Sequence, residues 1–163
     1  MEGNKNKPRV LLVFGAPCSG KTTFAEKFAK KFNLTYFDLN EVTTTYNMSR
    51  ENLLNALALV MRTRNTIILE GCLDTEKDRT EIRNAFRTAG YKPALIWVQT
   101  DFATIRNRLK MRHRTVAKAK KVYDEAIEKL EAPTNVEAPI ILSGKHTFET
   151  QTKHVLSGLA DAN

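Results

Sequence analysis

Residues 10–22 read Val-Leu-Leu-Val-Phe-Gly-Ala-Pro-Cys-Ser-Gly-Lys-Thr, an apolar run followed by a glycine-flanked loop. The last eight of these residues match G-x-x-x-x-G-K-[ST] at every fixed position, the pattern of a loop that binds phosphate. The apolar run predicts a buried strand before the loop, and the spacing of Phe24, Ala25 and Phe28 predicts a helix after it. Strand, loop and helix are the setting that this motif requires, so a nucleoside triphosphate is the expected ligand.

Each residue type in this loop has a physical role in holding a triphosphate. Glycines let backbone N–H groups turn inward around a phosphate, and the following helix directs its positive dipole end to the same place. Lys21 is expected to reach the β- and γ-phosphates as a catalytic residue, and Thr22 to ligate the metal, so the expected cofactor is Mg²⁺ with ATP or GTP. The expected nucleotide-binding residues are Gly15, Ala16, Pro17, Cys18, Ser19, Gly20, Lys21, Thr22 and Thr23.

The composition predicts one compact domain. A chain of 163 residues that is 42% hydrophobic can bury one core but is short for two ordinary domains. We expect residues 1–8 to be a mobile basic tail and residues 9–163 to be the domain. No apolar stretch approaches the length of a membrane span, and residues 1–9 lack the hydrophobic segment of a signal peptide, so we expect a cytoplasmic protein. Cys18 and Cys72 are too few for a disulfide framework and lack zinc-ligand spacing.

The net charge of +8 comes from one segment. Eight of the 26 lysines and arginines lie between Phe102 and Tyr123 with no acid among them, and without them the remaining 18 balance the 18 acids. Such a segment favours a polyanionic ligand, although a solvated helix face is the alternative. These cations are Arg106, Arg108, Lys110, Arg112, Arg114, Lys118, Lys120 and Lys121.

Apolar runs alternate with helical patterns along the whole chain. Strands are expected at 9–14, 34–37, 66–69, 94–98 and 139–142, with helices at 21–32, 75–89, 115–130 and 146–159 and others beginning near Ser49 and Asp101. The polar residues 40–47 are expected to form a loop. This alternation predicts an α/β fold, a single doubly wound domain with a five-stranded parallel sheet flanked by helices. Ligands of such sheets bind beyond the carboxyl ends of the strands.

Two acidic residues follow strands at that edge. Asp38 ends the second strand, where a carboxylate could deprotonate or position an acceptor hydroxyl as a catalytic residue. A helix or turn cap, or an outer-sphere contact to Mg²⁺ through water, are its alternatives. Glu70 ends the third strand, at the place of a Walker-B acid, and is expected to contact a metal-bound water or the acceptor.

Arginines supply the remaining candidates. Arg108 and Arg112 share one helix face and are expected to be catalytic, stabilising transition-state charge from a basic, lid-like segment at about 108–135. Arg114 in the following turn is a further lid candidate. Arg50 and Arg62 bracket the helix after Asp38 and could hold an acceptor phosphate, although solvated helix ends are favoured. Phe148 and Trp97 are interpreted as core residues rather than base-stacking platforms.

With these residues in place, the chain resembles the small P-loop kinases from about Arg9 to Leu159. This is the group that contains adenylate, shikimate and gluconate kinases and the kinase module of polynucleotide kinases. The resemblance rests on Val-Phe-Gly-Ala-Pro-Cys-Ser-Gly-Lys-Thr-Thr, on Asp38, on Ile-Leu-Glu-Gly after the third strand and on the arginine-rich stretch before the lid. It implies a fold similar to nucleoside monophosphate kinases.

The acceptor side follows no single member of that group. Polynucleotide kinases typically place an Arg three residues after the acceptor-site Asp, where this chain has Glu41. Asp-x-Asp and Gly-Gly-Gly of shikimate kinases are replaced by Asp38-Leu39-Asn40 and Glu70-Gly71-Cys72. The signatures Thr-Gly-Asp and Asp-Gly-Phe-Pro-Arg of adenylate kinases are absent from the sequence.

Together the residues and the resemblance predict a phosphotransferase that moves the γ-phosphoryl of ATP or GTP onto a hydroxyl. The expected acceptor is anionic: a nucleic-acid 5′-end, a nucleotide or a small metabolite. The alternative is a regulatory NTPase that binds nucleic acid in a nucleotide-dependent way. No membrane partner is expected, and the oligomeric state is left open.

Overall fold

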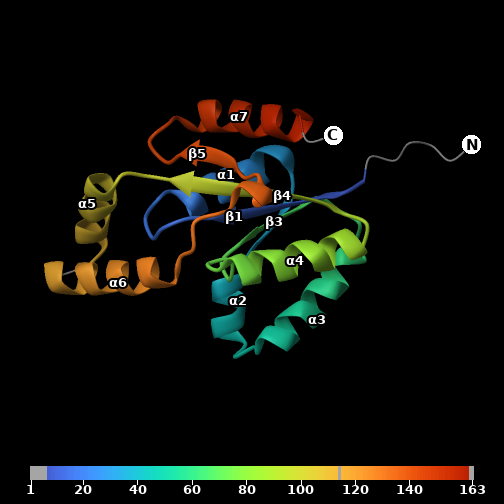
Figure 1. Cartoon of the computed structure of the whole chain (residues 1–163), viewed down its shortest axis with the longest axis horizontal. Helices are drawn as coiled ribbons and strands as arrows, with labels where there is room; N and C mark the ends of the chain where they lie inside the picture. Colours follow the sequence, from blue (N-terminus) through green and yellow to red (C-terminus); the bar gives the residue numbers. More distant parts are fainter. Residues whose placement is uncertain (1–6, 114, 162–163) are drawn as a thin grey trace, which may run out of the picture.

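The computed structural model describes residues 7–113 and 115–161, so most of the tail predicted to be mobile lies outside the described residues. Five parallel strands form a sheet in the order β2-β3-β1-β4-β5 (Figure 1). This arrangement confirms the predicted doubly wound α/β fold. The strands are β1 (Arg9–Phe14), β2 (Thr35–Asp38), β3 (Ile67–Glu70), β4 (Lys92–Gln99) and β5 (Ile140–Ser143).

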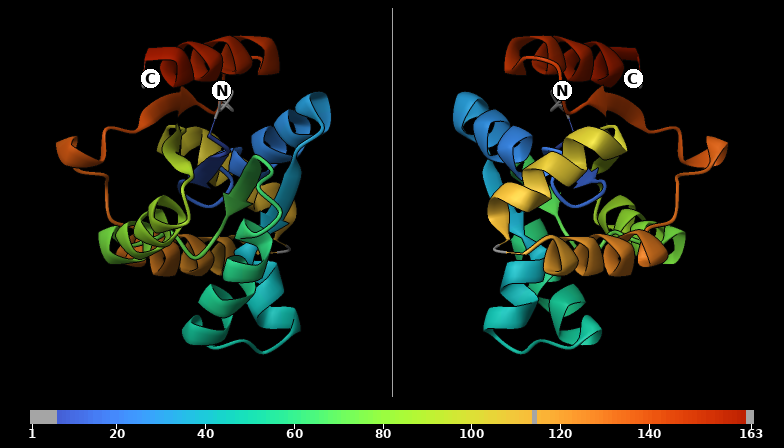
Figure 2. Two further views of the ribbon diagram at one scale, coloured as in Figure 1. Left: turned by 90° about the vertical axis from the view of Figure 1, so that its right-hand side faces the viewer. Right: turned by 90° about the vertical axis from the view of Figure 1, so that its left-hand side faces the viewer.

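Helices cover both faces of the sheet, as two views at right angles to Figure 1 show (Figure 2). Apolar side chains of α1 and α7 pack on one face, and those of α3 and α4 pack on the other. The central strand β1 alternates between the two cores, with Leu11 and Val13 in one and Leu12 and Phe14 in the other. The helices are α1 (Lys21–Phe32), α2 (Leu39–Thr45), α3 (Arg50–Met61), α4 (Glu76–Thr88), α5 (Phe102–Arg112), α6 (Val116–Lys129) and α7 (Phe148–Asp161).

Side-chain caps define most helix starts. Ser49, Thr75, Asp101 and Thr115 each accept a backbone N–H from the first turn of the helix that they precede. Asn33 ends α1 in the left-handed conformation, and its N–H bonds the Ala29 carbonyl. These local signals are legible in the sequence, and the observed helix bounds lie within two residues of the expected ones.

One expected loop was wrong. Residues 40–47 were expected to be irregular because they are polar, but α2 runs from Leu39 to Thr45. The helix forms because the Asp38 carboxylate caps it and because Leu39, only 1% exposed, anchors its first turn in the core. Thr43 Oγ1 also donates back to the Leu39 carbonyl, so a polar residue is accommodated inside the helix (2.7 Å).

The helices α5 and α6 project beyond the carboxyl end of β4, away from the α3–α4 layer (Figure 1). They share a small core of Ile105, Leu109 and Ala119, which also meets Ala16 and Cys18 of the phosphate-binding loop. Asp101 anchors the start of α5 through an ion pair with Lys145 (3.0 Å). We call this helix pair the lid, and it occupies the basic segment expected from the sequence.

A buried ion pair ties α4 to the chain segment between α6 and β5. The Arg79 guanidinium, fully buried, donates to both carboxylate oxygens of Glu137 at 2.7 and 3.0 Å, and lies 4.6 Å from the centre of the Phe14 ring. Burial raises the pKa of Glu137, but the hydrogen bonds and charge of Arg79 outweigh that effect and hold it below its usual range. Arg79 also donates to the carbonyl oxygens of Leu73, Asp74 and Glu131.

Among the described residues, no helix combines the length and apolar character needed to cross a membrane.

We expect the substitution Arg79→Met to lower the free energy of unfolding by about 3–5 kcal/mol, because it leaves the buried Glu137 carboxylate without its partner. Denaturant unfolding followed by circular dichroism measures the loss. The matched control is Arg87→Met on the exposed side of the same helix, which should change stability by less than about 0.5 kcal/mol. Equal effects of the two substitutions would contradict the structural role of Arg79.

Candidate functional site

The phosphate-binding loop connects β1 to α1 and is closed by its own backbone. Gly20 precedes α1 with a φ of 104°, a backbone conformation that residues other than glycine rarely adopt. The Phe24 backbone N–H donates to the Gly20 carbonyl. The Ser19 backbone N–H donates to the Ala16 carbonyl (3.2 Å), which closes a turn within the loop. Lys21 Nζ donates to the same Ala16 carbonyl (3.3 Å), so its ammonium group lies across the loop.

Neighbouring strand ends hold the loop from outside. Thr100, just after β4, donates its hydroxyl to the Ser19 carbonyl (2.8 Å). Gly144, just after β5, lies so close to Ser19 that any Cβ at this position would overlap the Ser19 carbonyl oxygen. The loop between β5 and α7 therefore touches the phosphate-binding loop, and a glycine is required for that approach.

Glu70 reaches the first turn of α1 from the adjacent strand. Because Val13 of β1 pairs with Glu70 of β3, the carboxylate lies beside the end of the phosphate-binding loop. Thr22 Oγ1 donates to Glu70 Oε1 at 2.5 Å, and Tyr36 Oη donates to Oε2 at 3.0 Å. Glu70 is only 3% exposed, and burial raises its pKa although the Thr22 hydrogen bond and the Lys21 charge act in the opposite direction.

These oxygen atoms fit a magnesium ion that binds together with a nucleotide. Mg²⁺ favours oxygen ligands and usually takes one or two protein groups, with phosphates and waters completing its shell. Among the described residues, no group of three or more His, Cys, Asp or Glu side chains forms a metal cluster. Thr22 and Glu70 would therefore supply only part of such a site, and its remaining ligands would come from the triphosphate and water.

Asp38 lies beside Glu70 in the sheet and caps a helix. The two residues are paired in register across β2 and β3. Asp38 Oδ1 accepts the backbone N–H groups of Asn40 at 2.9 Å and Glu41 at 3.2 Å, which is one of the alternatives considered from the sequence. No hydrogen bond to Oδ2 of Asp38 is seen among the described residues. One carboxylate can therefore cap α2 and still present an oxygen at the rim.

Asn40 is a residue that the sequence analysis missed. Its Oδ1 accepts the backbone N–H of Cys72 (3.0 Å), and its side chain lies against Gly71, whose φ is 82°. These contacts join the start of α2 to the loop that directly follows Glu70. An asparagine in a polar segment gives no signal of such a contact, because its partner is 32 residues away.

Arg50 does not act as a free cation. Its guanidinium forms ion pairs with Asp78 at 3.3 Å and Glu81 at 2.8 Å, and donates to the Cys72 carbonyl at 3.1 Å. The favoured expectation of a solvated helix end was therefore wrong for Arg50, which ties α3 to α4. Arg62 at the other end of α3 is exposed, as expected.

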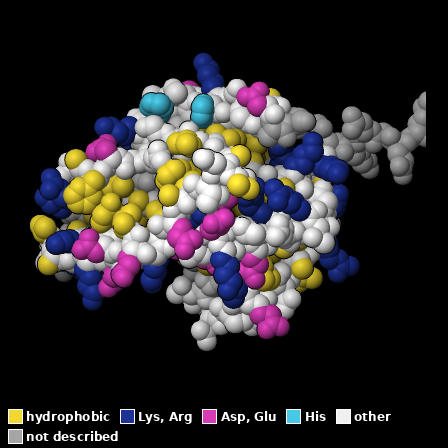
Figure 3. Space-filling model, in the orientation of Figure 1, with side chains coloured by type: hydrophobic (Ala, Val, Ile, Leu, Met, Phe, Trp, Pro, Cys, Tyr) yellow, Lys and Arg dark blue, Asp and Glu magenta, His cyan; other side chains and the backbone are white. Residues whose placement is uncertain are grey.

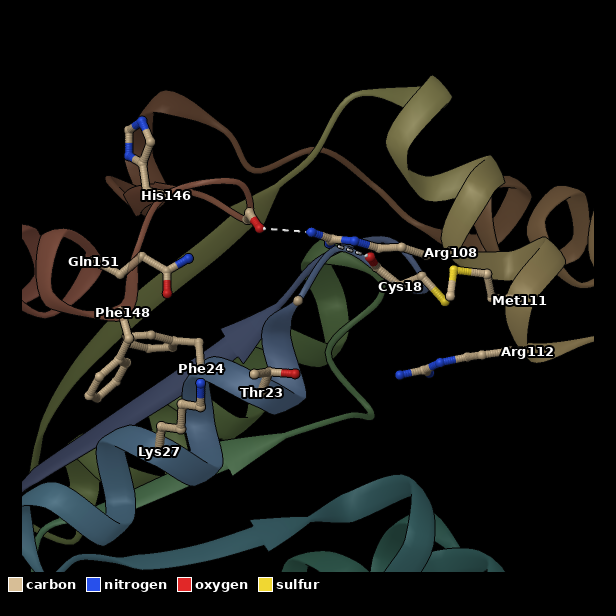
Figure 4. Close-up of a pocket in the computed structure, with 12 residues that line it drawn as sticks. Cys18, Thr23, Phe24, Lys27, Arg108, Met111, Arg112, His146, Phe148 and Gln151 are labelled. Carbon is tan, nitrogen blue, oxygen red and sulfur yellow. Dashed lines mark hydrogen bonds between the residues drawn. The ribbon is translucent and has the colours of Figure 1, made fainter.

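Two arginines of the lid, Arg108 and Arg112, lie at a cleft beside the phosphate-binding loop. Arg108 donates to the Cys18 carbonyl at 3.0 Å and to the Gly144 carbonyl at 3.1 Å, so it bridges the phosphate-binding loop and the loop after β5 (Figure 4). Arg112, one turn further along α5, extends into the same cleft (Figure 4). Arg114 lies outside the described residues.

A cleft of about 500 Å³ lies between the lid, α1 and the start of α7. Gly20 and Thr23 form its phosphate-loop end, and Phe148 packs against Phe24 on its opposite side, with ring centres 6.3 Å apart (Figure 4). Phe148 thus joins the core, as expected, and also lines the cleft. Five other lining residues were not expected from the sequence, namely Lys27, Met111, Gly144, His146 and Gln151. These residues come together only through tertiary packing, and no sequence motif predicts that they share a cleft.

Solved structures share this fold. A gluconokinase from Sinorhizobium meliloti 1021 superposes with a TM-score of 0.70 at 15% identity, covering 95% of this chain and 93% of that one. Kti12 from Chaetomium thermophilum, in complex with ADP-AlF3, gives 0.70 at 17% identity over 94% and 98%. The Mycobacterium tuberculosis APS kinase, in complex with AMPPNP and APS, gives 0.66 at 15% over 94% and 98%. These similarities confirm the expected small P-loop kinase fold.

A comparison with curated proteins finds no relative by sequence. A protein-family profile described as an AAA domain matches residues 10–135, which is well over half of the chain and includes the phosphate-binding loop, Asp38, Glu70 and α5. The chain therefore belongs to this AAA domain family of P-loop proteins.

Proposed function

We propose that this protein is a phosphotransferase that moves the γ-phosphoryl of ATP or GTP onto a hydroxyl of an anionic acceptor. The observation that supports the proposal is the different hydrogen bonding of two neighbouring carboxylates. Glu70 is engaged by Thr22 on the metal side of the phosphate-binding loop. Asp38, its partner in the sheet register, keeps an oxygen that can face an acceptor hydroxyl.

The donor half follows from the phosphate-binding loop and the cleft beside it. Backbone N–H groups of the loop bind the β-phosphate, and Lys21 exchanges its bond to the Ala16 carbonyl for phosphate oxygens. The cleft of about 500 Å³ takes the ribose and base, with Phe148 along its wall. Bound Mg²⁺, held through Thr22 with Glu70 beside it, would neutralise charge on the β- and γ-phosphates.

The lid arginines serve the transferred group. Arg108 already lies against the phosphate-binding loop, and Arg112 extends into the cleft from the same helix face. Their fixed positive charge stabilises negative charge that spreads over the phosphoryl oxygens during transfer. Arg114 is proposed as a further lid cation. Arg50 is not assigned to the acceptor, because its guanidinium is held by Asp78 and Glu81.

Acceptor deprotonation is assigned to Asp38. A carboxylate at hydrogen-bond distance from a hydroxyl can take its proton as the oxygen attacks phosphorus. A regulatory NTPase is the second candidate, favoured by the hydrogen bonds that make Asp38 a helix cap. Incubation with γ-labelled ATP and pools of 5′-hydroxyl oligonucleotides and metabolites separates the two, because a transferase labels an acceptor whereas an NTPase releases only inorganic phosphate.

The substitution Lys21→Ala should reduce labelling of the acceptor by about 100-fold or more, since it removes the positive charge that the Lys21 side chain places beside the transferred phosphoryl group. Quantitative γ-label transfer at saturating acceptor measures the effect. Lys30→Ala, on the exposed side of the same helix, is the matched control and should transfer label at the normal rate. Normal transfer by the Lys21 variant would remove the phosphate-binding loop from the mechanism.

For Asp38→Asn we expect the turnover number to fall by about 10²- to 10⁴-fold while donor affinity is kept. Asparagine is also a good helix cap, so the start of α2 is preserved and the charge alone is removed. Turnover and nucleotide binding are measured separately. Glu41→Gln, which removes an exposed negative charge three residues away, is the control. If turnover survives in the Asp38 variant, this residue is a helix cap and not the base.

The variant Glu70→Gln should require about 10- to 100-fold more Mg²⁺ for half-maximal activity, because the carboxylate that orients Thr22 and metal-bound water is gone. Titration of Mg²⁺ at saturating ATP gives this value. Glu26→Gln on the exposed surface of α1 should leave the requirement unchanged. An unaltered Mg²⁺ requirement in the Glu70 variant would argue against a role in metal binding.

A further inference from the structure

The helix α5 directs its cations to two opposite sides of the lid. Side chains two residues apart on an α-helix lie about 200° apart, whereas those four apart share a face. Arg108 and Arg112 accordingly line the cleft beside the phosphate-binding loop. Arg106 and Lys110 line a separate groove between α5 and α6, on the side that the proposed reaction does not use.

This second groove, which we call the lid groove, has an apolar floor and cationic edges. Its volume is about 310 Å³, and Leu109 and Ala119 form part of its floor. Arg106 and Lys110 reach it from α5 and Lys120 from α6, against a single acid, Asp124. On the face drawn in Figure 3, hydrophobic side chains are gathered at the end of the molecule formed by the lid, with lysine and arginine side chains and some acidic ones around them.

Two aromatic rings border the lid groove. Phe102 is 55% exposed although it is a large apolar side chain at the start of α5. Its ring lies 5.0 Å from that of Tyr123 on α6, at an interplanar angle of 58°, and the Arg106 guanidinium is 5.9 Å from its centre. An exposed ring next to a cation is the arrangement that stacks nucleic-acid bases while the cation contacts the backbone.

We propose that the lid groove binds single-stranded nucleic acid, with a base stacked on Phe102 and the backbone phosphates held by Arg106, Lys110 and Lys120. Charge complementarity supports this occupant, because the eight cations between Phe102 and Tyr123, all in the lid segment, equal the whole net charge of +8. A duplex keeps its bases stacked on one another, so it has no free base face to offer the ring. The proposal is independent of phosphoryl transfer, since no residue of the lid groove is assigned to the reaction.

Fluorescence anisotropy with 3′-labelled oligonucleotides of about 12 nucleotides tests the proposal. The oligonucleotides carry a 5′-phosphate, so they offer no 5′-hydroxyl as an acceptor, and no nucleotide is added in the first series. We expect binding at low ionic strength whose logarithmic affinity falls linearly with the logarithm of salt concentration. Absence of binding at about 20 mM salt would overturn the proposal.

Removal of the edge charges should weaken binding and flatten its salt dependence. The triple variant Arg106→Gln, Lys110→Gln and Lys120→Gln should lower the slope by about 2, because each phosphate that a cation neutralises on a single strand adds about 0.7 to it. The matched control removes three exposed lysines elsewhere: Lys30→Gln, Lys77→Gln and Lys153→Gln. An equal weakening in this control would mean attraction by net charge alone and would overturn the proposal.

Removal of the exposed ring should weaken single-strand binding by about 5- to 100-fold. Phe102→Ala tests this, and Phe102→Leu keeps an apolar side chain without a stacking surface, so both should bind weakly while their thermal unfolding matches the parent protein. Binding that is unaffected by either substitution, or equal binding of duplex and single strand, would overturn the stacking role.

Two further measurements separate the lid groove from other surfaces. Saturating ATP should leave oligonucleotide binding intact, because the cleft beside the phosphate-binding loop, proposed to bind ATP and here called the donor cleft, is on the opposite side of α5. Competition by ATP would place the oligonucleotide in the donor cleft and overturn the proposal. Anionic vesicles of phosphatidylserine and phosphatidylcholine should not displace the oligonucleotide, and displacement that Phe102→Ala abolishes would identify a membrane surface as the occupant instead.

Discussion

The parallel pairing of β1 with β3 on one side and β4 on the other is the constraint on which the site depends. It brings three chain segments, far apart in the sequence, to one edge of the sheet. The pairing of Val13 with Glu70 sets the carboxylate beside Thr22, and the end of β4 leads through Thr100 to the phosphate-binding loop. A shift of one residue in register would turn Glu70 to the other face and separate it from Thr22.

The structure separates a tightly held core from a lid with few ties to it. In the core, the buried Arg79 binds Glu137 and three backbone carbonyls, and so joins the loop before α4 to the segment that leads to β5. The lid has its own small apolar core, and its polar ties near the donor site are the bonds of Arg108 and the ion pair of Asp101. The proposed role of the lid arginines requires that they approach a fixed phosphate-binding loop, and few polar ties would oppose that movement.

The acceptor half of the site holds fewer available cations than the sequence suggested. Arg50 is held by its contacts to α4, and Asn40 covers Gly71 behind the metal-side carboxylate. The proposal therefore assigns the attraction of an anionic acceptor to the cations of the lid. Because α5 alternates its cations between two sides, Arg108 and Arg112 line one cleft and Arg106 and Lys110 line the other, which is why two separate roles are proposed for them.

The sequence by itself determined the strand, loop and helix around Lys21, the parallel sheet and most helix caps, because each rests on local periodicity or on a short motif. It also located Glu70 and Asp38 at the rim, since parallel strands end at one edge. Only the tertiary structure decided that α2 replaces a polar loop, that Arg50 is paired, and that Phe148 and Gln151 line the cleft beside the phosphate-binding loop. Those outcomes depend on partners distant in the chain, whose distance and orientation no local pattern encodes.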